Sequence, residues 1–144
     1  MDVIELDFEG YYRRVNWNKL DDISAVYCIY ACTYNNGNDT VSIRELLYIG
    51  ESEQLKTRVT DPNHQGVRKA QKRLKDGEVL CLSYAKVDGR SRLRIENALI
   101  FEHQPICCID DKDSYTHETV KIKTSGKNKY LSKEFIVEQG SEVD

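Results

Sequence analysis

The chain has 144 residues, of which 40% are hydrophobic and 31% charged, with a formal net charge of −3. That length fits one domain and that composition excludes disorder as the default, while the acidic balance alone does not favour a nucleic-acid partner. No apolar stretch approaches the ~20 residues of a membrane span, and the opening MDVIELDFEG lacks the basic and apolar regions of a signal peptide. We therefore expect a cytoplasmic protein without membrane contact. This expectation covers nucleoid-associated and phage-encoded proteins.

A β-hairpin is predicted over residues 24–50. The segment SAVYCIYAC (24–32) is rich in β-branched, aromatic and small residues, which is typical of a buried strand. The Asn-Gly pair in YNNGND favours a tight turn, and TVSIRELLYIG returns as the second strand. Because side chains alternate along a strand, the odd-numbered residues from Ala25 to Ala31 should share one face.

Three helices and a further strand are predicted after the hairpin. Ser52 is the expected N-cap of a short helix, SEQLKTRV, and after Pro62 the segment QGVRKAQKRLKDG predicts a basic helix that ends at Gly77. VLCLSYAKV predicts a third strand, and SRLRIENALIFEHQP predicts a helix that stops before Pro105. TVKIKTSGKNKYLSKEFIVEQ then predicts either a second hairpin that turns near Gly126 or a strand with a frayed end.

Positive charge is concentrated in residues 56–94, which hold eleven basic and four acidic residues, a net charge of +7. The rest of the chain carries a net charge of −10. Because fields at about 0.15 M salt are screened beyond ~8 Å, a basic middle can face an anion even in an acidic protein. An ordinary solvated helix face is the alternative, and the segment alone does not decide between them.

Cysteine usage favours buried, reduced thiols. The five cysteines are odd in number, scattered and partly adjacent, so they do not predict a disulfide framework. A zinc site made of Cys107, Cys108 and a histidine is conceivable, but no C-x-x-C spacing supports it.

Glu96 is a carboxylate placed among apolar neighbours of its predicted helix, beside Leu99 and Ile100. Such a group is costly to bury unless a cation, a hydrogen-bond donor or a metal pairs with it. The simplest partner is Arg92, four residues earlier, through an ordinary ion pair along the helix.

Four side chains could meet at one end of the sheet: Tyr27, Tyr48, Arg58 and Glu96. A phenol can position water or act as a general base if a nearby cation lowers its pKa. A guanidinium forks onto phosphate oxygens, and one carboxylate with waters and substrate oxygens can hold Mg²⁺. Together these groups are the minimum set for hydrolysing a phosphodiester.

Five segments in order along the chain resemble the motifs of the GIY-YIG endonuclease family. They are A-V-Y (25–27), Y-I-G (48–50), S-E-Q-L-K-T-R (52–58), I-E-N-A-L-I (95–100) and Q-P-I-C-C (104–108). Each segment is a weak signal alone, whereas the five in sequence are fairly specific. The resemblance covers most of the chain.

The resemblance implies an α+β fold in which helices flank a small three-stranded antiparallel sheet, with an additional C-terminal hairpin or extension. Tyr27 and Tyr48 match the two motif tyrosines, one of which activates the attacking water. Arg58 matches the arginine that contacts the scissile phosphate, and Glu96 matches the single metal-binding glutamate, which would hold Mg²⁺ or Mn²⁺. Gly50 would let the chain turn sharply and let the substrate approach the backbone.

Two departures from the family pattern lie in the first half of the chain. Ala25 replaces the first motif glycine, and YNNGNDTVSIREL lengthens the hairpin before the second motif, where it would touch DNA or a partner. The family often has a histidine, tyrosine or lysine about one turn after the arginine. Here Pro62 occupies that position and His64 is the nearest substitute. We include His64 in the predicted catalytic set; if it cannot reach, water activation falls to the tyrosines.

A third departure is Cys108, which stands where an asparagine normally closes the family motif. A thiol is a poorer hydrogen-bonding group than a carboxamide. Either activity is reduced, or Asn97 or Asp110 takes over this role.

The sequence thus predicts a divalent-metal-dependent endonuclease that hydrolyses phosphodiester bonds in DNA, with residues 24–108 as the core between extensions 1–23 and 109–144. The alternative is a non-cleaving nucleic-acid or protein binding module on a similar fold. Target choice would come from the loops, the tail, a second copy or a protein partner. The side chains predicted to contact the DNA backbone are Lys56, Arg68, Lys69, Lys72, Arg73 and Lys75.

Overall fold

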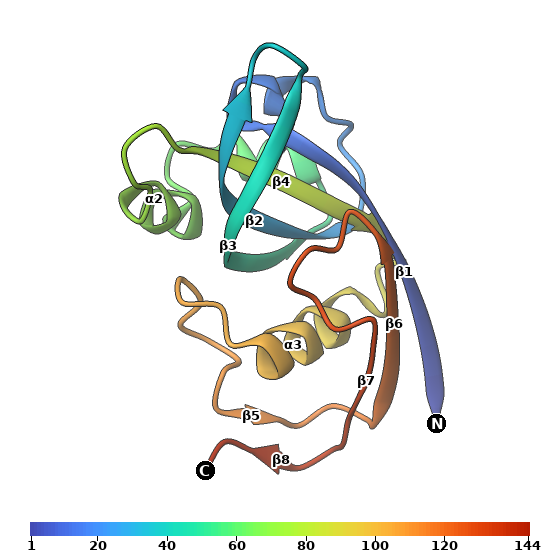
Figure 1. Cartoon of the computed structure of the whole chain (residues 1–144). Helices are drawn as coiled ribbons and strands as arrows, with labels where there is room; N and C mark the ends of the chain where they lie inside the picture. The colour runs from blue at the N-terminus through green and yellow to red at the C-terminus, as the bar shows by residue number, and fades with distance from the viewer.

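A curled mixed sheet of six strands organises the α+β fold in the computed structural model, which describes residues 1–144 (Figure 1). Its strand order is β3-β2-β4-β1-β6-β7. These strands are β1 (Asp2–Arg13), β2 (Ala25–Asn35), β3 (Thr40–Ser52), β4 (Val79–Lys86), β6 (Val120–Gly126) and β7 (Glu134–Val137). A second sheet pairs β5 (Ser114–Tyr115) with β8 (Ser141–Glu142). The helices are the 3₁₀ helix η1 (Arg14–Lys19), α1 (Leu55–Val59), α2 (Gln65–Lys72) and α3 (Arg92–His103).

The predicted hairpin and third strand are confirmed as β2, β3 and β4, which pair antiparallel with β2 in the middle. The odd-numbered side chains from Ala25 to Ala31 share one face, as the alternation predicted, and pack with the helices α1, α2 and η1. Val26 and Tyr30 point to the other face and pack with α3. Because helices cover both of its faces, β2 is apolar almost throughout.

Residues 1–23, predicted only as an extension, contain the strand that joins the two parts of the sheet. Asp2–Phe8 pair in parallel with β6, and Glu9–Arg13 pair antiparallel with β4 (Figure 1). Leu6 and Phe8 are both 2% exposed and belong to the core on the α3 side. The alternation of apolar and polar residues in VIELDFE carried this strand signal.

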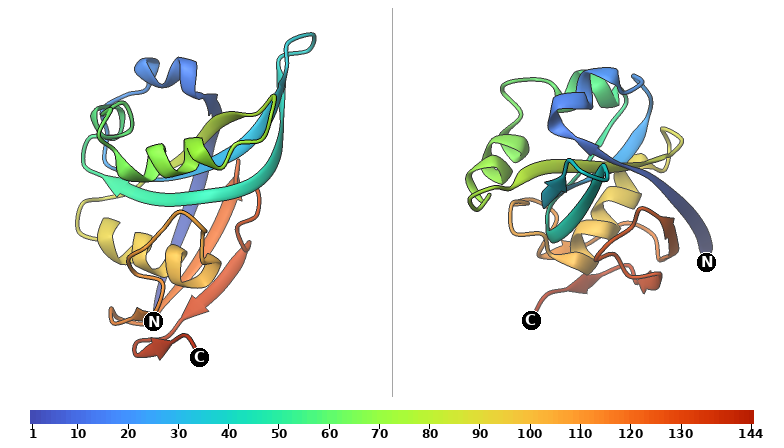
Figure 2. Two further views of the ribbon diagram at one scale, coloured as in Figure 1. Left: turned by 90° about the vertical axis from the view of Figure 1, so that its left-hand side faces the viewer. Right: turned by 45° about the horizontal axis from the view of Figure 1, so that its top comes forward.

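Helix α3 lies between the two parts of the sheet, with the β2–β3 hairpin on one side and β6 and β7 on the other (Figure 2). Helices α1, α2 and η1 cover the opposite face of the hairpin. α3 is the longest helix at 12 residues. No helix combines the length and apolar character that a bilayer crossing requires.

Two predicted helix boundaries were wrong. Ser52 does not cap α1, because β3 continues past Gly50 and pairs with β2 as far as Ser52. α2 ends at Lys72 rather than Gly77, and the turn that follows it is held by Glu78. The Glu78 carboxylate accepts hydrogen bonds from the Lys75 backbone N–H at 2.7 Å and from Arg44. The predicted second hairpin is confirmed, because β6 and β7 pair antiparallel.

The expectation that all five cysteines are free thiols was wrong for two of them. Cys32 and Cys81 form a disulfide between the neighbouring strands β2 and β4, with Cα atoms 6.4 Å apart. The strand register makes them diagonal neighbours on one face, a relation that residues 49 positions apart do not reveal in sequence. The three free cysteines are buried: Cys28, Cys107 and Cys108.

Replacing Phe8 with alanine is expected to lower the free energy of unfolding by about 3–5 kcal/mol, because it opens a cavity under the joining strand. Val3 lies on the same strand but is 53% exposed. Val3→Ala is therefore expected to change stability by less than about 0.5 kcal/mol. Urea unfolding of both variants measures the difference, and equal losses would contradict the assigned register of β1.

Candidate active site

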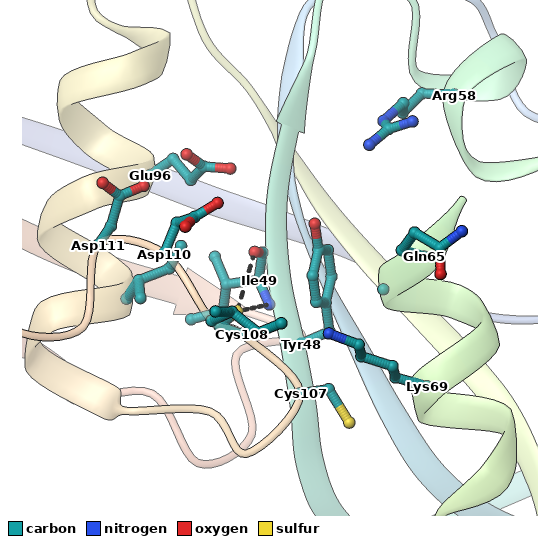
Figure 3. Close-up of a pocket in the computed structure, with 13 residues that line it drawn as sticks. Tyr48, Ile49, Arg58, Gln65, Lys69, Glu96, Cys107, Cys108, Asp110 and Asp111 are labelled. Carbon is teal, nitrogen blue, oxygen red and sulfur yellow. Dashed lines mark hydrogen bonds between the residues drawn. The ribbon is translucent and has the colours of Figure 1, made fainter. Parts of the chain in front are cut away.

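A pocket of about 270 Å³ lies between α2 and α3, beside the edge strand β3 (Figure 3). Acidic side chains form one wall, from α3 and the loop after it: Glu96, Asp110 and Asp111. Basic and amide side chains form the opposite wall, from α1 and α2: Arg58, Gln65 and Lys69. Tyr48 stands between the two walls with its hydroxyl in the gap (Figure 3). The separation of charge gives the pocket a cation-facing side and an anion-facing side.

Tyr48 is held in place by two glycines. A Cβ at Gly66 would lie 2.3 Å from the Tyr48 ring, and a Cβ at Gly50 would lie 2.5 Å from the Tyr27 ring and 2.8 Å from that of Tyr48. The predicted role of Gly50 in a sharp turn was wrong, because the residue lies inside β3 opposite Tyr27. Both glycines are required because the aromatic rings occupy the space of a side chain.

Tyr27 and His64 lie beneath Tyr48 rather than on the pocket surface. Tyr27 is 1% exposed and His64 is 0% exposed, and the Tyr27 hydroxyl lies 2.7 Å from His64 Nε2. His64 Nδ1 accepts the Val67 backbone N–H at the start of α2. The neutral ring therefore carries its proton on Nε2, which donates to the Tyr27 oxygen and leaves the Tyr27 proton for another acceptor.

Electrostatics keep these three rings uncharged. Burial, followed by the charge of Arg58, lowers the pKa of His64 from 6.5 to about 4. Burial raises the pKa of Tyr48 to about 12 and that of Tyr27 well above its ordinary value. At neutral pH they form an uncharged layer of hydroxyl and imidazole groups.

Arg58 enters the pocket from α1 with no ionic or hydrogen-bond partner for its guanidinium. Its neighbours Leu55 and Val59 are buried and fix the helix, while Arg58 itself is exposed. All of its N–H donors therefore remain available to an anion in the pocket.

Glu96 enters from α3 and is likewise without a side-chain partner, although the Glu51 backbone N–H partly stabilises its charged form. The simple alternative, an ion pair with Arg92, was wrong, because Arg92 pairs with Glu51 and donates to Ser24 Oγ at 2.9 Å. Burial, then the charges of Glu51, Asp111 and Asp110, raises the pKa of Glu96 to about 8. A partly buried carboxylate with this environment is a receptive position for a cation.

Cys108 performs the strand contact that an amide would make. Its thiol donates to the Ile49 carbonyl and accepts the Ile49 N–H, both at 3.4 Å (Figure 3). Asn97 does not replace it, because its amide lies 2.6 Å from His117 Nε2 and, when oriented to donate, 2.8 Å from Asp111. Of the two suggested substitutes, only Asp110 lines the pocket.

The basic helix extends the anion-facing wall. Lys69 lines the pocket, while Arg68 and Lys72 lie along the exposed face of α2, opposite the buried Val67 and Ala70. None of the six side chains predicted to contact DNA forms a salt bridge in the structure: Lys56, Arg68, Lys69, Lys72, Arg73 and Lys75.

The donor set for a metal is small. No group of three or more His, Cys, Asp or Glu side chains is arranged to hold a metal ion, and Cys107 with Cys108 forms none. Glu96 and its acidic neighbours fit an ion that takes one or two carboxylates and completes its shell with water and substrate phosphate, as Mg²⁺ commonly does.

Comparison with protein-family models, curated proteins and solved structures finds no match for this chain.

Sequence reasoning brought together Tyr48, Arg58 and Glu96 but missed several residues that shape the pocket. Gly66 was not singled out, although a glycine within a helix signals close packing. Asp111 also lines the pocket, from the loop after the motif segment 104–108, whereas sequence reasoning named only its neighbour Asp110.

Replacing Gly66 with alanine is expected to displace the Tyr48 ring and lower the free energy of unfolding by about 1–3 kcal/mol, because overpacking forces the neighbours apart. Gly89→Ala is the matched control, since its Cβ would meet an ordinary contact at 3.5 Å. Near-ultraviolet circular dichroism reports on the tyrosines and urea unfolding reports on stability. Equal effects of the two substitutions would contradict the packing.

Stability is expected to fall as the pH drops from about 6.5 to 4. In this range His64 is protonated in the unfolded chain but stays neutral in the native protein. Above this window both states are neutral and no stability is lost. The lowered pKa of His64 should make the free energy of unfolding roughly 2 kcal/mol smaller at pH 5 than at pH 8.

His64→Asn keeps an acceptor for the Val67 N–H and should remove this part of the pH dependence. Urea unfolding of both proteins at the two pH values measures it. His103, whose pKa burial also lowers, is present in both and cancels in the difference. An unchanged pH slope in the variant would contradict the neutral, buried ring.

Proposed function

We propose that the chain is a divalent-metal-dependent endonuclease of the GIY-YIG type that hydrolyses phosphodiester bonds in DNA. The observation that carries this proposal is the meeting of Tyr48, Arg58 and Glu96, from β3, α1 and α3, around one open pocket. Neither Arg58 nor Glu96 has a side-chain partner there. Chemistry on an anionic substrate uses groups that are left unpaired in this way.

The arrangement of strands supports the same proposal. Within the larger sheet, β3, β2 and β4 form a three-stranded antiparallel unit with Tyr27 and Tyr48 on its two first strands. The family resemblance implies a separate sheet of three antiparallel strands, whereas in this chain β1, β6 and β7 extend the sheet to six strands.

In this proposal Arg58 binds the scissile phosphate and stabilises the charge that builds on its oxygens. Tyr48, whose hydroxyl stands between the walls, orients the water whose oxygen attacks phosphorus while one P–O ester bond breaks. Tyr27 supports Tyr48 from below, with its hydroxyl fixed by His64. His64 is thus a positioning residue, because its Nε2 proton faces Tyr27.

Glu96 would hold the divalent ion, Mg²⁺ or Mn²⁺, which would supply charge neutralisation at the phosphate oxygens. Asp110 lies on the same wall and is exposed, so it can accept hydrogen bonds from the waters of such an ion. The free cations of α2 would follow the DNA backbone outward from the pocket.

A binding module that does not cut is the second candidate function. Two observations favour it: the buried position of Tyr27 and the raised pKa of Glu96, which keeps much of the acid protonated at neutral pH. The two functions share the same basic wall and differ only in whether a phosphodiester is hydrolysed.

Glu96→Gln is expected to reduce Mg²⁺-dependent nicking of supercoiled plasmid by about a thousandfold, because the ion loses its protein ligand. Glu102→Gln, an exposed position on the same helix, is the matched control and should leave nicking unchanged. Gel mobility of the plasmid with Mg²⁺, with Mn²⁺ and with EDTA measures the rate.

Undiminished cutting by Glu96→Gln would remove the site assignment. Absence of nicking by the unaltered protein with either metal, together with tight DNA binding, would select the non-cleaving module.

A further inference from the structure

A second cleft lies at the far end of the β2–β3 hairpin, with a volume of about 430 Å³. Four segments outside the candidate active site build it: the end of β1, η1, the hairpin tip and the loop after β6. Aromatic and basic side chains dominate its lining, namely Tyr11, Tyr12, Arg13, Tyr34 and Lys127. We call it the hairpin cleft.

Arg13 is the cation at the centre of the hairpin cleft. Its guanidinium carbon lies 3.6 Å from the centroid of the Tyr34 ring, and the Tyr34 hydroxyl donates to Asp39 at 2.8 Å. Asp39 is the one acid in the lining, and no salt bridge joins it to Arg13. The guanidinium is therefore held flat on an aromatic ring with its hydrogen-bond donors unused.

The loop after β6 adds two further free cations on an ordered backbone. The Lys127 N–H donates to the Phe8 carbonyl at 2.8 Å, and the Lys129 N–H donates to the Tyr11 hydroxyl at 3.1 Å. The Tyr30 hydroxyl donates to the Lys129 carbonyl at 2.9 Å. These bonds fix the loop backbone. The Lys129 ammonium lies 5.4 Å from the centroid of the Tyr130 ring, and neither lysine forms a salt bridge.

The strand that leads into this loop provides a useful contrast. Lys121 and Lys123 point to the outer face of β6, where both lie within 3.7 Å of Glu134. Between Thr119 and Lys133 the chain contains no acidic residue, so the cations of the loop have no acidic neighbour in sequence. Free cations beside aromatic rings form the type of surface with which proteins bind a nucleic-acid strand.

We infer that the hairpin cleft is a second DNA contact, which holds one strand with its phosphates on Arg13 and Lys127 in the cleft and on Lys129 of the adjoining loop, and with a base against the tyrosines. The inference rests on the proposed function for the identity of the partner. Tyr34 is seven residues from Tyr27 on β2, or roughly 20 Å along the strand. The cleft would therefore engage the strand several nucleotides from the cut.

The test measures binding without cleavage, by fluorescence anisotropy of a labelled single-stranded DNA oligonucleotide in EDTA at several salt concentrations. Lys127→Ala combined with Lys129→Ala is expected to weaken binding roughly tenfold at low salt and to reduce the salt slope by about 1–2. Lys121→Ala combined with Lys123→Ala removes the same charge from paired lysines, so its affinity should stay within about twofold of the unaltered protein.

Arg13→Gln tests the cleft from β1 and separates binding from folding. If the inference holds, Arg13→Gln binds the oligonucleotide more weakly than the unaltered protein. Its melting temperature then changes no more than that of the variant with Lys127→Ala and Lys129→Ala. If Arg13 only stabilises the hairpin, the melting temperature falls and the affinity is unchanged, which overturns the inference. Equal losses of affinity in the two lysine pairs also overturn it, because they indicate a net-charge effect only.

The failure of this inference is distinct from failure of the proposed nuclease. The oligonucleotide is bound in EDTA, whereas nicking requires Mg²⁺ or Mn²⁺, so an unaltered protein that binds through the cleft cations without cutting supports the inference while removing the enzyme. A protein that nicks plasmid but binds equally well with and without the cleft cations keeps the enzyme and overturns the inference.

Discussion

The constraint on which the fold depends is the division of β1 between two partners. Its first part pairs with β6 and its second part pairs with β4, so one strand holds together two parts of a sheet that share no other pairing. Leu6 and Phe8 anchor this strand in the core against α3. The space between the two parts is where α3 lies, and α3 carries Glu96 to the pocket.

Within that frame the candidate site depends on close packing of aromatic rings against bare backbone. Gly50 and Gly66 leave room for Tyr27 and Tyr48, and His64 ties Tyr27 to the start of α2. An uncharged layer of rings thus forms the floor, while opposite charges occupy the walls. This separation of charge suits an anion and a cation together, because each meets the wall of opposite sign.

Segments away from the candidate active site form a second surface, which combines aromatic and basic side chains. This surface exists only because β1 pairs with both β4 and β6. That pairing places the end of β1 and the loop after β6 beside the hairpin tip. The candidate active-site pocket and the hairpin cleft lie toward opposite ends of β2.

Local pattern in the sequence was sufficient for β2, β3, β4 and α3, because alternation, turn residues and the stop at Pro105 act over a few residues. The residue types also predicted that Tyr27, Tyr48, Arg58 and Glu96 meet at one end of the sheet, and the structure brings the last three together around one pocket. Tertiary structure decided what depends on contacts between distant segments: the joining role of β1, the Cys32–Cys81 disulfide, the Arg92–Glu51 pair and the packing of Gly66 against Tyr48. Those features depend on the register between paired strands and on contacts between segments that are far apart in the sequence. Such contacts are set by the whole fold and not by a local pattern.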